Sequence, residues 1–335
     1  ESTIPVQMPN TENDAKARTR LSGWASRSSR CYSRGVPSAL VRHAERDRVF
    51  VGVVDRMLRV DGGYSGGGRR ELSSDSAIRS ADGDLGDVMV VGGGISGLTA
   101  AIEAAEAGAN VTLVEKEAFL GGRVARTNLY FPKMCPPSCG IEINIRRVKT
   151  NPLIRTLTLS TVESITGGPG AYKAKIQKAP RFVNSKCTTC GDCVDVCPVD
   201  RPDAFNLGMG TTKAVYRPYE MAYPARFVID EATCLGASEC GKCVEACPYG
   251  AIDLDMPEDD FELRIGAIIV ATGWKPYDAS KLDHLAYGKS PNVITNVMME
   301  RLAARRGPTG GEIVRPSDGK KAENVAFVQC ARSRD

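Results

Sequence analysis

The pattern of hydrophobic and polar positions changes abruptly near residue 87. Residues 1–86 show little sustained helical or strand period and are rich in Arg, Ser and Gly. From Asp87 the chain reads as an apolar strand, a glycine turn, an Ala-rich amphipathic helix that stops at Gly108, and a second strand that ends at Glu115. This order predicts a βαβ unit of about 30 residues. We expect residues 1–86 to be a disordered or artefactual leader.

The pattern then predicts an insert between two strands. A short strand over residues 172–178 is followed by Pro180, which opens a cysteine-rich stretch that runs to about Pro257. Residues 261–273 return as a buried strand that ends in a glycine turn.

The last part of the chain predicts mixed elements. Residues 292–307 indicate a loop and a helix, and residues 311–330 indicate a hairpin-like excursion and a further strand that carries Cys330. The chain ends five residues later, where a new βαβ unit would begin, so we expect a truncated fragment.

The cysteines change this picture most. Of twelve cysteines, eight form two tight groups, two lie in the CPPSC stretch over 135–139, and Cys31 and Cys330 stand alone. Tight groups with two-residue spacing indicate metal binding in a reducing compartment rather than a disulfide framework. The formal net charge of +4 does not indicate nucleic-acid binding. No apolar run approaches the roughly 20 residues that cross a bilayer, so we expect a soluble protein, or one held at a membrane only through a partner.

The glycine turn after the first strand has the spacing of a dinucleotide-binding fingerprint. Gly92 permits the tight turn, Gly94 lets the backbone approach a pyrophosphate, and Gly97 lets helix and strand pack closely. The phosphates would lie at the helix N-terminus, where free N–H groups and the dipole favour negative charge. Glu115 lies where an acid would bind the ribose hydroxyls.

Two further stretches favour FAD over NAD. Gly121, Gly122 and Arg123 follow the second strand, and Thr272 and Gly273 follow a later strand, as in flavoproteins with two dinucleotide-binding domains, which these stretches resemble. That resemblance places Arg123 near the pyrophosphate or the flavin and Thr272-Gly273 on the far side of the cofactor. The alternatives are a solvated surface arginine and an ordinary turn after a strand.

Each of the two cysteine groups matches one half of a two-cluster ferredoxin, in which the fourth cysteine of one half binds the cluster of the other. The first group follows the regular C-x2-C-x2-C-x3-C-P spacing, and the second repeats it with a longer first gap. We predict two [4Fe–4S] clusters. The expected ligands are Cys187, Cys190, Cys193 and Cys247 for one cluster, and Cys234, Cys240, Cys243 and Cys197 for the other.

The five-residue gap between Cys234 and Cys240 makes the first of these a doubtful ligand when the second group is considered alone. Because Cys197 still needs three partners, and because residues 236–238 are small, we expect a lengthened loop around an intact site. Zinc is the alternative, but structural zinc sites take two separated pairs of ligands. The 36-residue aromatic- and proline-rich stretch between the groups is expected to pack the insert onto the flavin domain.

Cys135 and Cys139 flank two prolines and a serine after the Gly-Gly-Arg turn. Three hypotheses stay open for them: ligands of a further cluster, a redox-active thiol pair, or buried structural cysteines. Cys330 is expected to be buried, and Cys31 has no assignment. Only two histidines are present, which disfavours His-based acid–base or nucleophilic chemistry and favours electron transfer by cofactors.

Together these motifs predict an α/β protein in which a Rossmann-like FAD-binding domain is interrupted by an α+β ferredoxin-like domain with two [4Fe–4S] clusters. The expected divisions are the leader, then 87–180 as the first part of the FAD-binding domain and 181–257 as the insert. Residues 258–335 would be the return of the FAD-binding domain and the start of a truncated second dinucleotide-binding domain.

The motifs in this order resemble the heterodisulfide reductase A-subunit family. The order is VGGGISGLTAA, GGRVAR, a two-cysteine loop, two ferredoxin halves and IGAIIVATGW, and the resemblance covers about residues 87–335. It implies a subunit of a cytoplasmic complex that carries FAD and [4Fe–4S] clusters. Its partners would be other subunits of that complex.

Two details are more similar to the QmoA type, the flavin subunit of the quinone-interacting membrane-bound oxidoreductase of sulfate reducers. They are CPPSCGIEIN at 135–144 and the lengthened spacing ahead of ECGKCVEACPYGAIDLDM. This resemblance implies that the partners are adenylylsulfate reductase and a quinone-reactive membrane subunit, with association to the membrane through a partner.

The expected function is therefore electron transfer between FAD and two [4Fe–4S] clusters by an oxidoreductase subunit. One alternative is an FAD- and NAD(P)H-dependent oxidoreductase of the glutamate-synthase small-subunit type, in which the ferredoxin segment precedes the fingerprint instead of following it. The other is a non-catalytic iron–sulfur electron-carrier subunit without flavin.

Overall fold

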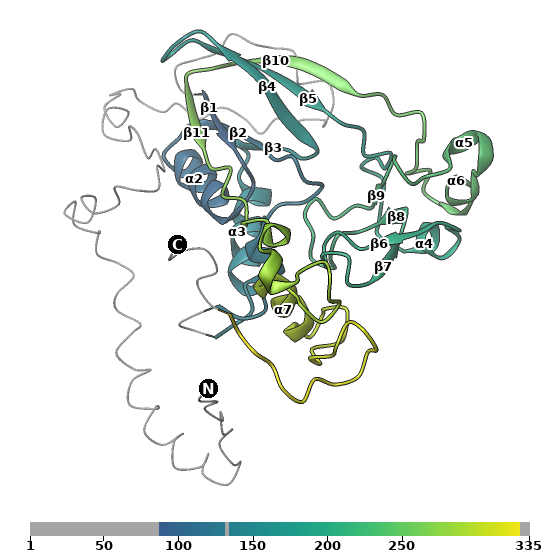
Figure 1. Cartoon of the computed structure of the whole chain (residues 1–335). Helices are drawn as coiled ribbons and strands as arrows, with labels where there is room; N and C mark the ends of the chain where they lie inside the picture. The colour runs from purple at the N-terminus through teal and green to yellow at the C-terminus, as the bar shows by residue number, and fades with distance from the viewer. Residues whose placement is uncertain (1–86, 131–133, 329–335) are drawn as a thin grey trace, which may run out of the picture. The chain divides into compact units, whose positions relative to one another are not determined.

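The computed structural model describes residues 87–130 and 134–328 of the chain, which Figure 1 shows as a whole. The leader expected over residues 1–86, the unassigned Cys31 and the Cys330 that we expected to be buried lie outside these residues. Among the residues described, no helix is both long enough and apolar enough to cross a membrane.

A four-stranded parallel sheet carries the glycine turn. Its strands are β1 (Asp87–Val91), β2 (Asn110–Val114), β3 (Ile154–Leu157) and β11 (Ala267–Val270), in the spatial order β11-β1-β2-β3. Every neighbouring pair is parallel, and helix α2 (Ile95–Glu106) connects β1 to β2. Because parallel strands end at the same edge of a sheet, the turns after β1, β2 and β11 meet there.

Alternate residues of β1 are buried against two different layers. Val88 and Val90 pack against α2, in a core that includes Leu98. Met89 points to the opposite face and packs with Ile176 of a second sheet. The two-residue period of a strand that is covered on both faces accounts for this continuous apolar run.

The second sheet is antiparallel and has the order β10-β5-β4. Its strands are β4 (Ser160–Thr166), β5 (Tyr172–Lys178) and β10 (Asp259–Ile265). Lys178 at the end of β5 pairs with Asp259 at the start of β10. The cysteine-rich insert therefore leaves and re-enters this sheet at adjacent residues, as can be followed in Figure 1.

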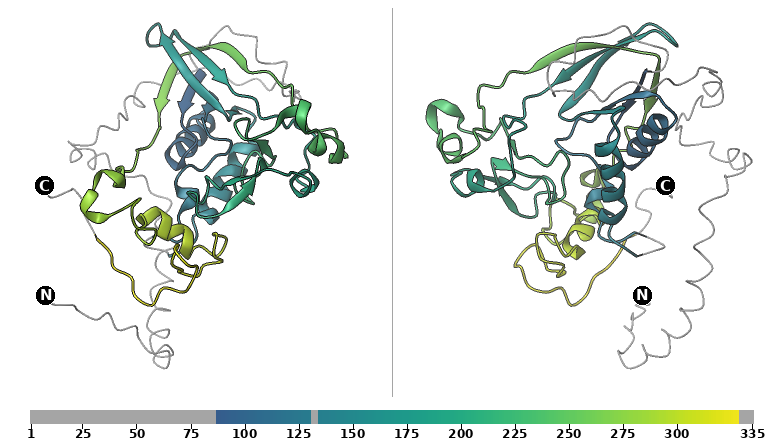
Figure 2. Two further views of the ribbon diagram at one scale, coloured as in Figure 1. Left: turned by 45° about the vertical axis from the view of Figure 1, so that its right-hand side comes forward. Right: turned by 180° about the vertical axis from the view of Figure 1, so that it is seen from behind.

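The insert is built from short elements around its cysteines. These elements are α4 (Asp192–Asp195), β6 (Asp200–Pro202), β7 (Thr211–Lys213), β8 (Val215–Tyr216), β9 (Val228–Ile229), α5 (Gly236–Glu239) and α6 (Lys242–Ala246). Strands β6 and β7 pair with each other, as do β8 and β9. Helices α4 and α6 contact each other and can be located in Figures 1 and 2. Cys193 and Cys243 belong to the apolar core of the insert, together with Val183, Val215 and Ile252.

The stretch between the two cysteine groups packs the insert against the segment after β2, as predicted. The hydroxyl of Tyr219 donates to the carbonyl of Leu120 at 3.2 Å, and the Leu120 amide donates to the carbonyl of Tyr223 at 2.9 Å. Phe119 contacts Tyr219 and Phe205 edge-on, with ring centroids 5.4 and 5.7 Å away. This aromatic cluster gives the junction an apolar core of its own.

The strand expected over residues 261–273 is two strands in two different sheets. Strand β10 ends at Ile265 and β11 begins at Ala267, with Gly266 between them. Strand β11 lies at the edge of the parallel sheet, where Val270 is 57% exposed. The expectation of a buried strand is therefore wrong for the end of β11, because no described strand covers its outer side.

The C-terminal part agrees with the sequence pattern in its helix but not in its last strand. Helix α7 (Asn296–Ala303) begins after Thr295, whose hydroxyl accepts from the Met298 amide at 3.3 Å. The short helices η5 (Ala279–Lys281) and η6 (Asp283–Leu285) precede it. A single bridge between Val314 and Lys321 forms the expected excursion. The strand predicted after it is not formed over 324–328, where the apolar side chains are exposed and lie beside no described strand.

Four elements between the glycine turn and β5 were not predicted. They are the short helix η4 (Val124–Arg126), helix α3 (Ser138–Thr150) and strands β3 and β4. The helical signal is present, because Ile141, Ile145 and Val148 recur at helical spacing, but the cysteine and two prolines before it are typical of a loop. Arg147 of α3 lies 2.7 Å from Glu106 of α2 and joins the two helices.

Candidate functional site

Two glycines of the turn after β1, Gly92 and Gly97, leave no room for a larger residue. Gly92 has φ +108°, and a Cβ there would lie 2.3 Å from the carbonyl oxygen of Ala271. A Cβ on Gly97 would lie 1.7 Å from the carbonyl oxygen of Gly92. The turn, the first turn of α2 and the end of β11 are therefore in direct backbone contact.

Gly94 differs from the other two because it faces open space. A Cβ on Gly94 would meet nothing within 4 Å. Gly94 is the N-cap residue of α2, a helix of twelve residues, and its carbonyl accepts from the Leu98 amide at 2.8 Å. The free space lies where helix N–H groups favour an anion, so the residues present fit a dinucleotide pyrophosphate.

Glu115 closes the turn from the adjacent strand. Its Oε2 accepts from the Gly93 amide at 2.6 Å, and its Oε1 accepts from the Glu117 amide at 2.8 Å. Burial raises the pKa of this carboxyl, while the two backbone N–H groups act in the opposite direction. The carboxylate thus has a structural role in addition to the predicted contact with a ribose.

Gly93 is a residue that the sequence analysis missed. A Cβ there would lie 2.5 Å from Cδ2 of Leu120 and 3.0 Å from Oε2 of Glu115. The unbroken run of three glycines was a signal for this crowding, but the fingerprint assigns no role to its second position.

The second glycine pair packs directly on the first turn. The Gly121 amide donates to the Gly93 carbonyl at 2.8 Å, and a Cβ on Gly122 would lie 3.0 Å from the Cα of Gly94. Both glycines of the pair have positive φ angles, of +111° and +55°. The structure therefore brings Gly121 and Gly122 next to the open space at Gly94.

Arg123 and the turn after β11 also meet. The guanidinium of Arg123 lies 4.9 Å from the ring centroid of Trp274, and both side chains are exposed. Gly273 has φ +69°, and the Thr272 amide nitrogen would lie 3.2 Å from a Cβ on Gly92. A cofactor contact by Arg123 or by Thr272-Gly273 stays a prediction.

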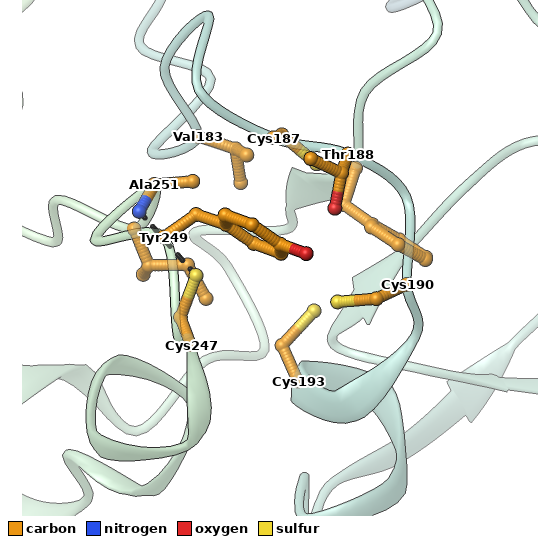
Figure 3. A pocket seen from close by; sticks show the side chains of 10 residues that line it. Val183, Cys187, Thr188, Cys190, Cys193, Cys247, Tyr249 and Ala251 are labelled. Atoms are coloured by element: carbon orange, nitrogen blue, oxygen red, sulfur yellow. Dashed lines mark hydrogen bonds between the residues drawn. The ribbon is translucent and has the colours of Figure 1, made fainter.

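The first four expected cluster ligands surround one cavity. It is lined by the four thiols together with apolar side chains that include Val183 and Phe227. Figure 3 shows the sulfur atoms of Cys190, Cys193 and Cys247 directed into it. The Ala251 amide donates to Sγ of Cys247 at 3.3 Å. We call this the first cavity; its four cysteines are Cys187, Cys190, Cys193 and Cys247.

The other four expected ligands surround a second cavity, which again has an apolar lining. The five residues between the first two cysteines of that group contain helix α5, and the Gly236 amide donates to Sγ of Cys234 at 3.5 Å. The lengthened spacing is therefore folded into one helical turn, and Cys234 still lines the cavity. The four cysteines of this second cavity are Cys197, Cys234, Cys240 and Cys243.

The crossed arrangement follows from two adjacent helices. Cys193 lies on α4 and Cys243 lies on α6, each facing the cavity of its own group. The last cysteine of each group follows its helix and reaches the neighbouring cavity, because α4 and α6 are in contact. Within the described residues, no group of three His, Cys, Asp or Glu side chains forms a site for a single metal ion. The eight thiols surround two spaces instead.

The chemistry of the thiols fits iron–sulfur clusters. Burial raises the pKa of Cys193 to about 12, with Cys187 and Cys190 acting in the same direction. Burial likewise raises the pKa of Cys243, with Cys234 the next contribution. Four thiolates in one apolar cavity would repel one another, so the cysteines are protonated unless cationic iron is bound and stabilises the thiolate form.

Cys135 and Cys139 lie outside both cavities. The Tyr130 amide donates to the carbonyl of Cys135 at 3.2 Å, and Cys139 is exposed in the first turn of α3. Neither forms a disulfide. The exposure of Cys139 does not match the hypothesis of buried structural cysteines, and the other two hypotheses stay open.

Known proteins match the two regions just described. Residues 87–140 match the family model of the FAD dependent oxidoreductases, and residues 186–251 match the 4Fe-4S dicluster domain. Over 268 residues the chain is 40% identical to the A subunit of the Ferredoxin:CoB-CoM heterodisulfide reductase of Methanosarcina mazei. The aligned part of the chain is therefore similar to the A subunits of heterodisulfide reductases. The match covers 79% of this chain and 33% of that relative.

A second similar protein is the first iron-sulfur A subunit of the CoB–CoM heterodisulfide reductase of Methanopyrus kandleri. It is 42% identical over 251 residues, which are 74% of this chain and 37% of that protein. The chain spans about a third of the length of the curated heterodisulfide reductase subunits that it matches. Among solved structures, the thioredoxin reductase of T. acidophilum is 24% identical, covering 27% of this chain and 31% of that chain with a TM-score of 0.24.

The two matching domain families and the geometry agree on the cofactors. The FAD dependent oxidoreductase match covers the glycine turn, and the dicluster match covers both cysteine groups. The predicted fold class is confirmed, with a parallel sheet crossed by α2 and a cysteine-rich domain inserted between β5 and β10. The predicted cofactors, FAD and two [4Fe–4S] clusters, are confirmed at the level of the two domain families.

Proposed function

We propose that this chain is an oxidoreductase subunit that passes electrons between FAD and two [4Fe–4S] clusters in a heterodisulfide-reductase-type complex. The observation that carries the proposal is the occurrence of a dinucleotide turn and two four-cysteine cavities in one chain, joined by direct contacts. FAD supplies paired-electron chemistry and the clusters supply single-electron steps. Neither requires an acid–base side chain.

In this proposal the glycine turn holds FAD. Gly94 and the N-terminus of α2 would bind the pyrophosphate in the open space. The free lone pairs of the Glu115 carboxylate would accept hydrogen bonds from the ribose hydroxyls. Gly121 and Gly122 would leave room for the phosphates, because neither has a side chain and a Cβ on Gly122 would lie 3.0 Å from the Cα of Gly94.

The eight cysteines would hold the clusters, four in each cavity. Helix α4 would carry Cys193 to the cluster of the first cavity, and α6 would carry Cys243 to the cluster of the second cavity. The amides of Ala251 and Gly236 would donate to cluster thiolates, a contact that favours the reduced cluster.

The aromatic cluster supports exchange between the two domains. Phe119 belongs to the segment between Glu115 and Gly121, and Tyr219 belongs to the insert. Their contact, with the hydrogen bonds at Leu120, would keep flavin and clusters at a constant separation. We assign residues 87–180 and 258–335 to the FAD-binding domain with the start of a second dinucleotide domain, and residues 181–257 to the insert.

The partners depend on the branch of the family. The relatives' names place them in ferredoxin- and hydrogen-linked CoB–CoM heterodisulfide reductases, which supports other subunits of such a complex as partners. The CPPSCGIEIN stretch and the Cys234–Cys240 spacing support the QmoA type instead, with adenylylsulfate reductase and a quinone-reactive membrane subunit. Either branch fits a cytoplasmic complex, held at a membrane only through a partner.

The test is anaerobic purification of the full-length protein with counts of iron, sulfide and flavin. Binding at the glycine turn requires one FAD, and its flavin absorption should lie over the broad cluster absorbance. The clusters of the insert require about eight irons in addition to any that other domains bind. Clusters without flavin would instead support the iron–sulfur carrier, and NAD(P)H oxidation by the isolated subunit would support the glutamate-synthase type. Assays with heterodisulfide and with quinone then separate the two branches.

A further inference from the structure

We propose that Arg181 is a positioning residue that fixes the insert on the parallel sheet and places a permanent positive charge beside the first cavity, so that the cluster held there is easier to reduce. The inference rests on the proposed function, because it requires a cluster in that cavity. Nothing in the sequence motifs singles out this arginine, which is separated from Cys187 by five residues.

The guanidinium of Arg181 joins three separate parts of the chain. Its Nη2 donates to the hydroxyl of Thr158 at 2.9 Å and to the carbonyl of Ala118, and its Nη1 donates to the carbonyl of Phe227 at 3.4 Å. Ala118 and Thr158 follow β2 and β3 of the parallel sheet. Phe227 lines the first cavity. One side chain therefore bonds the sheet that carries the glycine turn to the wall of a cluster site.

The charge of Arg181 is buried among neutral acceptors. Arg181 is only 7% exposed, and its three hydrogen-bond partners are two carbonyl groups and one hydroxyl. Burial lowers the pKa of Arg181 to about 10, with Arg226 acting in the same direction and Tyr216 and Cys187 acting against it. The group therefore stays protonated at neutral pH.

A buried cation without a carboxylate among these partners is costly unless a negative group lies near it. The cluster with its four thiolates is such a group. The carbonyl that accepts from Nη1 of Arg181 belongs to Phe227, which lines the first cavity together with Cys187. When the cluster takes up one electron it gains one negative charge and no bond forms or breaks, so a nearby fixed cation favours the reduced state. The electron donor is the reduced flavin in the proposed function and dithionite in the test.

Arg301 provides a matched control. It is also buried, at 4% exposure, and its guanidinium donates to the Asn206 side chain at 2.9 Å and to the carbonyls of Arg126 and Arg306 at 3.3 and 3.1 Å. Burial lowers its pKa as well, but the charges that act on it are those of Asp203 and Arg126 and not those of cluster cysteines. Its removal should disturb packing without changing the potential of the first-cavity cluster.

The experiment is a redox titration of the full-length protein with dithionite, followed by electron paramagnetic resonance, for wild type, Arg181→Gln, Arg181→Lys and Arg301→Gln. The signal of the first-cavity cluster is identified in Cys234→Ser, which removes the other cluster. In Arg181→Gln we expect the ratio of reduced to oxidised first-cavity cluster at fixed potential to fall about tenfold, which is about 59 mV for one electron. Arg181→Lys and Arg301→Gln should stay near wild type, and the second-cavity cluster should not shift.

A second variant covers the case in which Arg181→Gln fails to fold. Thr158→Asp places a carboxylate against the same guanidinium, neutralises its charge and should lower the potential of the same cluster in the same direction. Unchanged midpoints in both variants, with clusters present, would overturn the inference and leave the proposed function standing. Wild-type protein without clusters in the insert would overturn the proposed function itself. An equal shift in Arg301→Gln would show a packing effect and also overturn the inference.

Discussion

The amide of Gly93 donates a 2.6 Å hydrogen bond to Oε2 of Glu115, 22 residues later in the chain. The bond forms because β1 and β2 are adjacent parallel strands that end at the same edge of the sheet. It makes the acidic residue part of the glycine turn, so the turn and the acid are one structural unit.

Replacing Glu115 with Gln should weaken both the fold and flavin binding. The amide has one oxygen and cannot accept from both the Gly93 and the Glu117 N–H groups, which leaves one buried donor without its acceptor. We expect a loss of about 1–3 kcal/mol in the free energy of unfolding, measured with urea, and a reduced flavin content. Glu117→Gln keeps the backbone donor and serves as the control, and an equal loss there would contradict the role of the Glu115 carboxylate.

The same carboxyl should contribute a pH dependence to stability. Burial raises the folded-state pKa of Glu115 above its ordinary value of 4.5. In the interval between the two values the folded chain holds a proton that the unfolded chain has lost, so the free energy of unfolding falls as the pH rises through this interval. Wild type should therefore lose stability relative to Glu115→Gln as the pH rises from about 4.5 through the folded pKa. A difference that does not vary with pH would disprove this contribution.

Gly94 and Gly97 should respond to alanine in different ways. A Cβ on Gly94 meets nothing within 4 Å, so Gly94→Ala should keep the melting temperature of the flavin-free protein and lose FAD affinity by about tenfold or more, because the methyl group enters the space of the pyrophosphate. Gly97→Ala places a Cβ 1.7 Å from the Gly92 carbonyl and should destabilise the fold by about 3 kcal/mol or more. Flavin titration and calorimetry separate the two effects. Unchanged FAD affinity in Gly94→Ala would show that the cofactor lies elsewhere.

Cys234 is tested by replacement with Ser. Because Cys234 lines the second cavity with three other thiols, Cys234→Ser should remove that cluster and leave the cluster of the first cavity. Iron content should fall by about four per chain, and one of two interacting paramagnetic signals should disappear. Cys187→Ser is the matched variant for the first cavity. Retention of both clusters in Cys234→Ser would show that the lengthened gap excludes this thiol.

Removing iron should loosen the insert more than the parallel sheet. The thiols of Cys193 and Cys243 belong to the apolar core of the insert, and burial raises the pKa of both, so the metal-free thiols are protonated and no longer hold the two cysteine groups together. After anaerobic chelation we expect amide exchange in residues 182–252 to become about tenfold faster or more, with β1 and α2 little changed. Uniformly faster exchange would mean that the two cores are not independent.

The βαβ unit and the identity of the chemistry could be predicted from the sequence because their signals are local. The strand, the three glycines and α2 follow each other without interruption, and cysteines two or three residues apart can reach one cluster. Helix α3 could have been found from its apolar period. The pairing in the second sheet was harder to predict. Strand β5 pairs with both β4 and β10, and β10 follows the whole insert in the sequence.

The sequence by itself determined the glycine turn, the acid after β2 and the two cysteine groups, since each depends on spacing within a short stretch. Only the tertiary structure decided that Gly93 must be small, that Val270 lies at an exposed edge, and that Arg181 is buried between Ala118, Thr158 and Phe227. Those partners are 63, 23 and 46 residues from Arg181. A charged side chain is buried when distant segments supply its acceptors, and the order of residues around it carries no sign of which segments they will be.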